Sequence, residues 1–266
     1  MLLCHIMKCE EIIQKLEEEF PLSCAEEWDN PGLLVGRRDR DVKKIYVTLD
    51  VTDEPLAEAV SWGADLIVSH HPMIFGAIRQ VNSDTFLGRR ILTLAENRVC
   101  CYAMHTNFDV RAMADLNERQ LGLLNTEVLL KTGENGGVPE GIGRIGRLPQ
   151  LMALDELAEL VKKGMGLPDV RCYGETGRRY GRVAVSGGSG KMVVKDALAA
   201  GAEVLVTGDI DYHTAIDAMA DGMCIIDAGH YGTEYCFIAY MAERLRGLFP
   251  ECQVKEAGVS QPFRVV

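Results

Sequence analysis

The spacing of hydrophobic and polar positions along the chain predicts an alternation of helices and strands. Between residues 8 and 20 the apolar side chains fall on one helical face, opposite a run of glutamates, as in an amphipathic helix. Farther on, short apolar runs of strand length alternate with stretches of helical period. Strands that alternate with helices form mostly parallel sheets, so we expect an α/β fold. The pattern predicts strands at 44–50, 65–69 and 99–104, and helices at 52–62 and 85–96.

The second half of the chain repeats this pattern. Residues 63–69 match residues 201–207 without a gap at an offset of 138, and the same offset carries the first strand onto residues 183–187. Matches that occur in one shared order indicate two related α/β halves. We therefore expect two α/β domains with mostly parallel sheets, over residues 1–130 and 131–266.

The segment between the two halves is rich in glycine. Residues 131–149 predict a connection followed by one strand. The pattern does not fix the domain boundary, and packing of the C-terminal helix against the first domain stays open.

The composition narrows the class of protein. The 266 residues are 47% hydrophobic and carry a formal charge of −11, which disfavours a protein that binds the phosphate backbone of nucleic acid. No apolar run reaches the roughly 18 residues of a membrane helix, and the apolar start, Met1 to Met7, is too short for a secretory signal. Met7 is an alternative first residue, because the amphipathic helix begins there. Nine cysteines without a Cys-x-x-Cys pair indicate reduced thiols, so we expect a cytoplasmic protein.

Two adjacent histidines follow the strand predicted at 65–69. Pro72 ends the strand directly after His70 and His71, because proline has no backbone donor. Ligands of open α/β sheets bind at the carboxyl ends of strands, where this pair lies. If the strand continues, the two imidazoles point to opposite sides, so two metal ions could take them more easily than one.

Two further histidines each precede a carboxylate by four residues. His105 precedes Asp109, and the pair recurs as His230 and Glu234 at an offset of 125. Imidazole and carboxylate suit Zn²⁺, Mn²⁺, Fe²⁺, Co²⁺ and Ni²⁺. A single strand-end histidine is more often a hydrogen-bonded structural residue, but the repetition of these pairs favours a metal site. Two such cations with two carboxylates keep a net positive charge, which favours a bridging hydroxide and an anionic or carbonyl-like substrate.

Other polar residues follow the second copy of the strand. Asp209, Asp211 and His213 stand where the repeat places the histidine pair, and they could orient metal ligands or act as general bases. Asp211 could equally cap the next helix. Residues 186–191 resemble a phosphate-binding loop without the full Walker pattern, so an anion-binding nest and a plain strand-to-helix turn both stay open.

Five motifs together resemble the Nif-three-like dinuclear-metal family, whose members are often named GTP cyclohydrolase I type 2 homologs. The resemblance covers nearly the whole chain and implies two α/β halves that face each other across a metal site, as well as a toroidal homohexamer. The motifs are Trp28-Asp29-Asn30-x-Gly32, Ser69-His70-His71-Pro72, His105-Thr106-Asn107-x-Asp109, Thr207-Gly208-Asp209 through His213, and Asp227-Ala228-Gly229-His230 through Glu234. By this resemblance the metal ligands would be His70, His71, Asp109, His230 and Glu234, with His105 close by.

The expected function is that of a metal-dependent hydrolase with two divalent ions per chain, drawn from zinc, iron, manganese, cobalt and nickel. If the family name holds, a metal-bridged hydroxide would attack a purine-ring carbon and open the ring of GTP. Catalytic roles are expected for His105, Asp209 and His213. The partner would be an anionic nucleotide or another phosphorylated small molecule, although no residue specifies guanine. The alternative is a non-enzymatic protein that handles metal or regulates through it.

Overall fold

The computed structural model describes residues 7–259 and 261–264, and it divides them into two units. The first unit holds residues 7–108 and 237–259, and the second holds residues 109–236 and 261–264. Residues 1–6, on which the expectations about a secretory signal and the first residue depend, lie outside the described residues. Residues 130 and 131, between which the sequence predicts a domain boundary, both lie in strand β7 (Leu124–Asn135).

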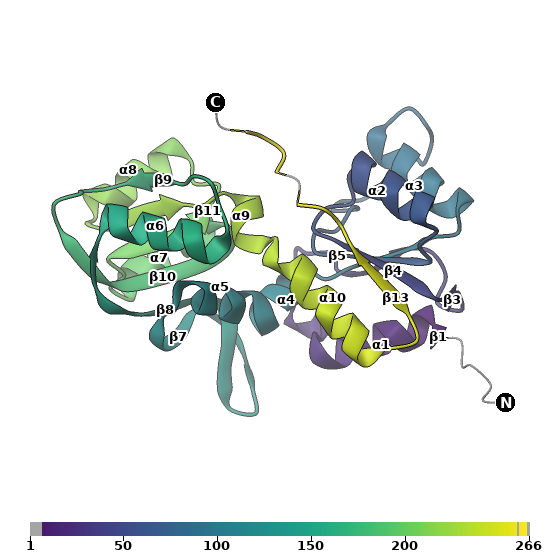
Figure 1. The fold of residues 1–266 in the computed structure, drawn as a ribbon, viewed down its shortest axis with the longest axis horizontal. Helices are drawn as coiled ribbons and strands as arrows, with labels where there is room; N and C mark the ends of the chain where they lie inside the picture. The colour runs from purple at the N-terminus through teal and green to yellow at the C-terminus, as the bar shows by residue number, and fades with distance from the viewer. Residues whose placement is uncertain (1–6, 260, 265–266) are drawn as a thin grey trace. The chain divides into compact units, whose positions relative to one another are not determined.

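The first unit is built on a five-stranded sheet in which three pairings are parallel and one is antiparallel. The strand order is β13 (Gln253–Glu256), β4 (Lys44–Thr48), β5 (Leu66–Ser69), β6 (Cys100–Ala103) and β2 (Gly32–Val35), with β2 antiparallel to β6. Figure 1 shows two helices on each face of this sheet: α2 (Asp53–Trp62) and α3 (Phe86–Glu96) on one, α1 (Cys9–Glu19) and α10 (Cys236–Leu248) on the other. A short pair, β1 (Met7–Lys8) and β3 (Asp41–Val42), the 3-10 turn Leu22–Cys24 and the turn α4 (Thr106–Phe108) complete the unit.

The predicted helices and strands of this half are confirmed to within two residues at each end. All four residues of β5 and of β6 are buried, because helices cover both faces of the sheet. This burial explains why these strands read as unbroken apolar runs instead of an alternation of apolar and polar residues.

The second unit is built on a six-stranded mixed sheet. Its order is β7, β8 (Val138–Ala153), β10 (Arg179–Ser189), β11 (Val204–Gly208), β12 (Cys224–Asp227) and β9 (Arg171–Tyr173). Only the pairings of β10 with β11 and of β11 with β12 are parallel, so the expectation of a mostly parallel sheet is wrong for this half. The helical elements are the π-helical turn Asp109–Met113, α5 (Ala114–Leu121), α6 (Leu154–Met165), the 3-10 turn Gly190–Val193, α7 (Val194–Ala199), α8 (Tyr212–Ala220) and α9 (His230–Glu234).

The glycine-rich segment 131–149 belongs to a long β-hairpin, not to a connection with one strand. Strands β7 and β8 pair antiparallel from Leu124 to Arg147, and Gly136 and Gly137 make the turn with positive φ angles. Glycine also allows the two strands to approach closely, because a Cβ atom on Gly141 would lie 1.9 Å from the Leu130 carbonyl oxygen. The hairpin supplies one of the two antiparallel edges of the sheet, and β9 supplies the other.

The internal repeat is confirmed by the strand registers. Ile45 pairs with Leu66 in the first sheet, and Val183 pairs with Val204 in the second, so both partners shift by the same 138 residues. Each unit therefore contains the same three parallel strands, β4-β5-β6 and β10-β11-β12. No helix in the described part of the chain is long and apolar enough to cross a membrane.

Candidate metal centre

Three imidazoles converge where two neighbouring strands of the first unit end. His70 and His71 follow β5, and His105 follows β6, which is parallel to β5 with Ser69 opposite Ala103. One ring nitrogen of each histidine lies within 4.8 Å of those of the other two. His70 is fully buried, and the side chains of His71 and His105 are 22% and 13% exposed. The strand ends thus collect three nitrogen donors of the kind that divalent transition metals bind.

Carboxylates hold two of these rings in place. The Nδ1 atom of His71 lies 2.8 Å from Asp50 Oδ1, and Nδ1 of His105 lies 2.7 Å from Asp29 Oδ1. A carboxylate only accepts, so a neutral ring donates from Nδ1 and keeps the lone pair of Nε2 for a ligand. This carboxylate–histidine arrangement commonly fixes the tautomer and the ring orientation of metal-binding histidines.

Asp29 is buried behind His105 and is well suited to this role. Burial alone would raise the pKa of the Asp29 carboxyl, but hydrogen bonds from His105 and Thr106 outweigh that effect and lower the pKa to about 2. The backbone N–H of Thr106 donates to Asp29 Oδ2 at 3.0 Å. The carboxylate therefore stays ionised and connects the turn after β6 to the segment that precedes β2.

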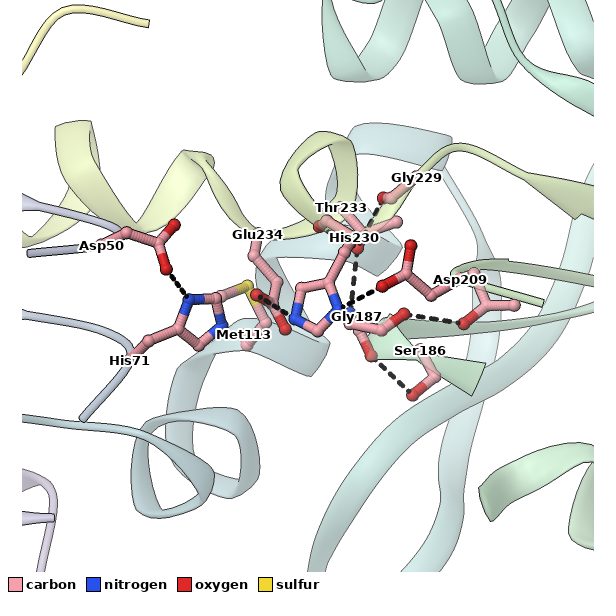
Figure 2. Close-up of polar contacts among 12 residues, drawn as sticks. Asp50, His71, Met113, Ser186, Gly187, Asp209, Gly229, His230, Thr233 and Glu234 are labelled. Carbon is pink, nitrogen blue, oxygen red and sulfur yellow. Dashed lines mark hydrogen bonds and ion pairs between the residues drawn. The ribbon is translucent and has the colours of Figure 1, made fainter. Parts of the chain in front are cut away.

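A second donor pair lies in the second unit. His230 opens α9 and Glu234 follows one turn later, with 3.2 Å between His230 Nε2 and Glu234 Oε2. The Nδ1 atom of His230 lies 3.0 Å from Asp209 Oδ2, and Figure 2 shows Asp209 and Glu234 on opposite sides of the ring. Asp209, which the sequence predicts as a catalytic or orienting residue, is thus placed to orient His230, as Asp50 orients His71.

Glycines at the end of β10 and directly after it permit close packing, and Gly188 makes room for the buried Glu234 carboxylate. A Cβ atom on Gly188 would lie 2.4 Å from Glu234 Oε1, and the Gly188 backbone donates to Thr233 Oγ1 at 2.9 Å. A Cβ atom on Gly190 would lie 2.3 Å from Thr207 Oγ1. Of the two alternatives for residues 186–191, the structure supports a strand-to-helix turn whose glycines serve close packing.

Asp109 opens the π-helical turn Asp109–Met113, a helix type that is frequent at functional sites. One of its carboxylate oxygens lies within 4.8 Å of an oxygen of Glu234. Two carboxylates and an imidazole within the second unit are again donors that a borderline divalent metal accepts. A buried carboxylate such as Glu234 is costly unless it is paired or bound to metal.

His213 and Asp211 lie apart from these groups. His213 is exposed in the first turn of α8, where its ring packs edge-on against Tyr212. No group of three metal-ligating side chains in the described part of the chain includes it. Asp211 caps α8, since its Oδ1 accepts from the Thr214 backbone at 3.0 Å, and this bond lowers the pKa of its carboxyl.

Sequence reasoning missed Asp29 and Asp50 as orienting residues. Asp50 comes two residues after β4, at the same edge of the sheet as His71. Because β4 is parallel to β5, residues that follow the two strands lie at the same edge of the sheet, and this placement could have identified Asp50 from the sequence.

Comparison with known proteins confirms the resemblance seen in the motifs. A family model described as Duf34/NIF3 (NGG1p interacting factor 3) matches residues 7–261. A Streptococcus pneumoniae protein named GTP cyclohydrolase 1 type 2 homolog is 37% identical over 246 residues, which cover 90% of each chain. A Clostridium perfringens protein of the same name is 33% identical over 242 residues, covering 90% of this chain and 92% of its own. The solved structure of a Bacillus cereus protein related to NIF3 has a TM-score of 0.92 at 26% identity, over 98% of this chain and 99% of its own. The chain belongs to the Duf34/NIF3 family.

Proposed function

We propose that this chain is a metal-dependent hydrolase whose cofactor is a pair of divalent metal ions. The convergence of His70, His71 and His105 carries the proposal, because two of these rings are held at Nδ1 by carboxylates as metal-binding histidines are. The oriented pair His230 and Glu234 supports a second set of donors. The proposed metal ligands are His70, His71, Asp109, His230 and Glu234, with His105 close by.

Each of the two donor sets is proposed to contribute metal ligands. Divalent ions held by these residues would supply Lewis acidity, which polarises a substrate and activates water near neutral pH. The side chains of the protein have separate tasks. Asp29, Asp50 and Asp209 keep the protons on Nδ1 and so aim Nε2 of each partner ring. His105 is proposed to move protons during the reaction, whereas the catalytic role of His213 stays a prediction from the sequence alone.

The names of the relatives support a nucleotide substrate. Proteins named GTP cyclohydrolase 1 type 2 homolog are similar over 90% of this chain, so we propose hydrolytic opening of the purine ring of GTP as the reaction. A cation pair with two carboxylates keeps a positive charge, which favours such an anionic molecule. The protein is further proposed to work as a toroidal homohexamer in the cytoplasm.

Elemental analysis of the purified protein tests the metal assignment. We expect about two ions per chain in the parent protein, and loss of most of the bound metal in His71→Ala and in Glu234→Ala. His213→Ala is the matched control, since it removes an exposed imidazole and should keep the metal. Full metal occupancy in both ligand variants would contradict the ligand assignment.

Turnover separates the hydrolase from a protein that only handles metal. The metal-loaded parent should convert GTP into a ring-opened product, detected by chromatography, whereas the Glu234→Ala variant should not. A parent that releases its metal to an acceptor protein and hydrolyses nothing would favour the metal-handling alternative.

A further inference from the structure

Two large aromatic side chains are exposed beside the three imidazoles of the first unit. Trp28 is 52% exposed and Phe75 is 54% exposed, and their ring centroids lie 5.8 Å apart at an interplanar angle of 35°. Each ring also meets His105, at 5.9 and 6.0 Å between centroids and nearly edge-on. Single exposed apolar residues are ordinary, but a cluster of them often marks a binding site.

Hydrogen bonds on both sides hold this aromatic pair in position. Asp29, next to Trp28, binds the His105 ring and the Thr106 backbone. The Asn30 amide donates to the Ile74 carbonyl at 2.7 Å, which joins the Trp28 turn to the loop that carries Phe75. The segments that carry the rings are therefore held together while the rings stay exposed, and such pre-organisation lowers the ordering cost of binding a ligand.

The spacing of the rings limits how a ligand can bind. A flat ring inserted between two others needs about 7 Å between them, twice the contact distance of about 3.5 Å. Trp28 and Phe75 are closer than that, so a guest ring must stack on their outer faces. Such stacking accepts any aromatic base, because it depends on the π face and not on a hydrogen-bond pattern.

We propose that Trp28 and Phe75 form a stacking platform that binds the flat heteroaromatic ring of the substrate next to the imidazoles. The inference rests on the proposed hydrolase function, for which it supplies the residues that bind the base of the substrate. Contact of both rings with His105 is the reason to assign the platform to a substrate. Neither aromatic ring carries charge, so the platform distinguishes a nucleotide from a molecule that has phosphates and no base.

Tryptophan fluorescence offers a direct test, because the chain has only two tryptophans, Trp28 and Trp62. Trp62 packs under the Lys44 ammonium at 5.0 Å, and Trp62→Phe keeps a ring for this contact while leaving Trp28 as the sole reporter. In the metal-loaded Trp62→Phe protein, GTP and guanosine should quench the emission and inorganic triphosphate should not. Equal quenching by triphosphate would overturn the inference.

Equilibrium dialysis with labelled GTP measures the contribution of each ring. We expect Trp28→Ala and Phe75→Ala each to weaken GTP binding at least about fivefold, and Trp28→Phe to recover part of the loss. Phe86→Ala is the matched control, because Phe86 is 58% exposed in the same unit with its ring under the Arg90 guanidinium. A Trp28→Ala variant with parental affinity for GTP and a smaller assembly in sedimentation would overturn the inference in favour of an interface between copies.

The proposed stacking platform and the proposed hydrolase function can be tested independently of each other. Turnover of GTP with an unchanged KM in Trp28→Ala would overturn the platform and leave the hydrolase intact. Binding of GTP that depends on Trp28, in a protein that never opens the ring, would support the platform and overturn the hydrolase.

Discussion

The ends of strands β5 and β11 are equivalent in the internal repeat, yet only β5 carries the histidine pair. The offset of 138 residues places His70 on Gly208. A Cβ atom on Gly208 would lie 2.5 Å from the backbone carbon of Gly229 and 2.5 Å from the backbone nitrogen of His230. The space that the candidate ligand His70 occupies in the first unit is filled by backbone in the second. The closeness of the Gly229–His230 backbone thus leaves no space for a side chain at this strand end of the second unit.

The opposite ends of the same strands are alike in both units. Asp65 accepts from the Arg40 guanidinium at 2.9 Å and from the backbone amides of residues 43 and 44. Glu203 accepts from the Arg178 guanidinium at 2.9 Å and from the backbone amides of residues 181 and 182. Each residue of the Glu203 network lies 138 positions after its counterpart in the Asp65 network. The repeat therefore keeps the network where the strands begin and differs where they end, which is where the candidate ligands lie.

Gly208→Ala should have the largest effect, because it places a methyl group against backbone that cannot move aside. We expect the free energy of unfolding of the second unit to fall by more than about 3 kcal/mol. Urea unfolding followed by amide hydrogen exchange would show the loss, with β11 and β12 losing protection and β5 keeping it. Gly247→Ala is the control, since no atom lies within 4 Å of its added Cβ in α10. Parental stability in Gly208→Ala would contradict the account of why this strand end lacks a ligand.

The acidic residues at the strand starts should come next. Asp65→Ala and Glu203→Ala each remove a carboxylate that accepts three hydrogen bonds, so each should cost about 2–3 kcal/mol in free energy of unfolding. Asp65 should cost more, because its side chain is 19% exposed and that of Glu203 is 30% exposed. Urea unfolding measures both, with Asp39→Ala as a control for an exposed pair with Arg37. If only one of the two variants kept the parental free energy of unfolding, the hydrogen-bond network of that unit would not stabilise the fold.

Smaller still should be the effect of the carboxylates that orient the rings. Asp50→Asn and Asp209→Asn keep the shape of the side chain but remove its charge beside His71 and His230. We expect each to weaken metal binding by about 10–100-fold, without loss of the fold. Competition with a chelator measures the affinity, and Asp39→Asn serves as the exposed control. A loss in Asp50→Asn alone would restrict the metal to the first unit.

The strand end that carries the candidate ligands His70 and His71 could be predicted because a short apolar run followed by histidine and proline is a local signal. The sequence could not predict the hairpin of β7 and β8, because a glycine-rich segment has the same composition whether it forms a loop or closely paired strands. In this hairpin, glycine at position 141 allows close approach to Leu130. The sequence did predict that the offset of the repeat falls from 138 to 125 at the histidine–carboxylate pairs, but not where along the chain the change occurs. The strand registers make Cys224 of β12 the counterpart of Cys100 of β6, an offset of 124. The segment from Cys224 to His230 is one residue longer than the segment from Cys100 to His105, which gives the offset of 125 between the two histidines. Backbone pairing, not residue type, carries that information.

The hydrogen bonds of Glu203 should also make the stability of the second unit depend on pH. Burial alone would raise the pKa of the Glu203 carboxyl, but hydrogen bonds from the backbone amides of residues 182 and 181 and from Arg178 outweigh it and lower the pKa below its ordinary 4.5. The ionised group therefore stabilises the fold above about pH 4.5, and this contribution is lost as the pH falls through the lowered pKa.

The variant Glu203→Gln cannot ionise, so its deficit in free energy of unfolding should be present at pH 7 and shrink progressively below pH 4.5. We expect this charge-dependent part to be about 1 kcal/mol or less, because the side chain is 30% exposed and water screens it. Urea unfolding between pH 7 and about pH 3.5 measures the deficit, and Glu159→Gln, with its carboxylate 72% exposed beside Lys162, should show none at any pH. A deficit of the same size throughout that range would mean that the shape of the Glu203 side chain, and not its charge, holds the start of β11.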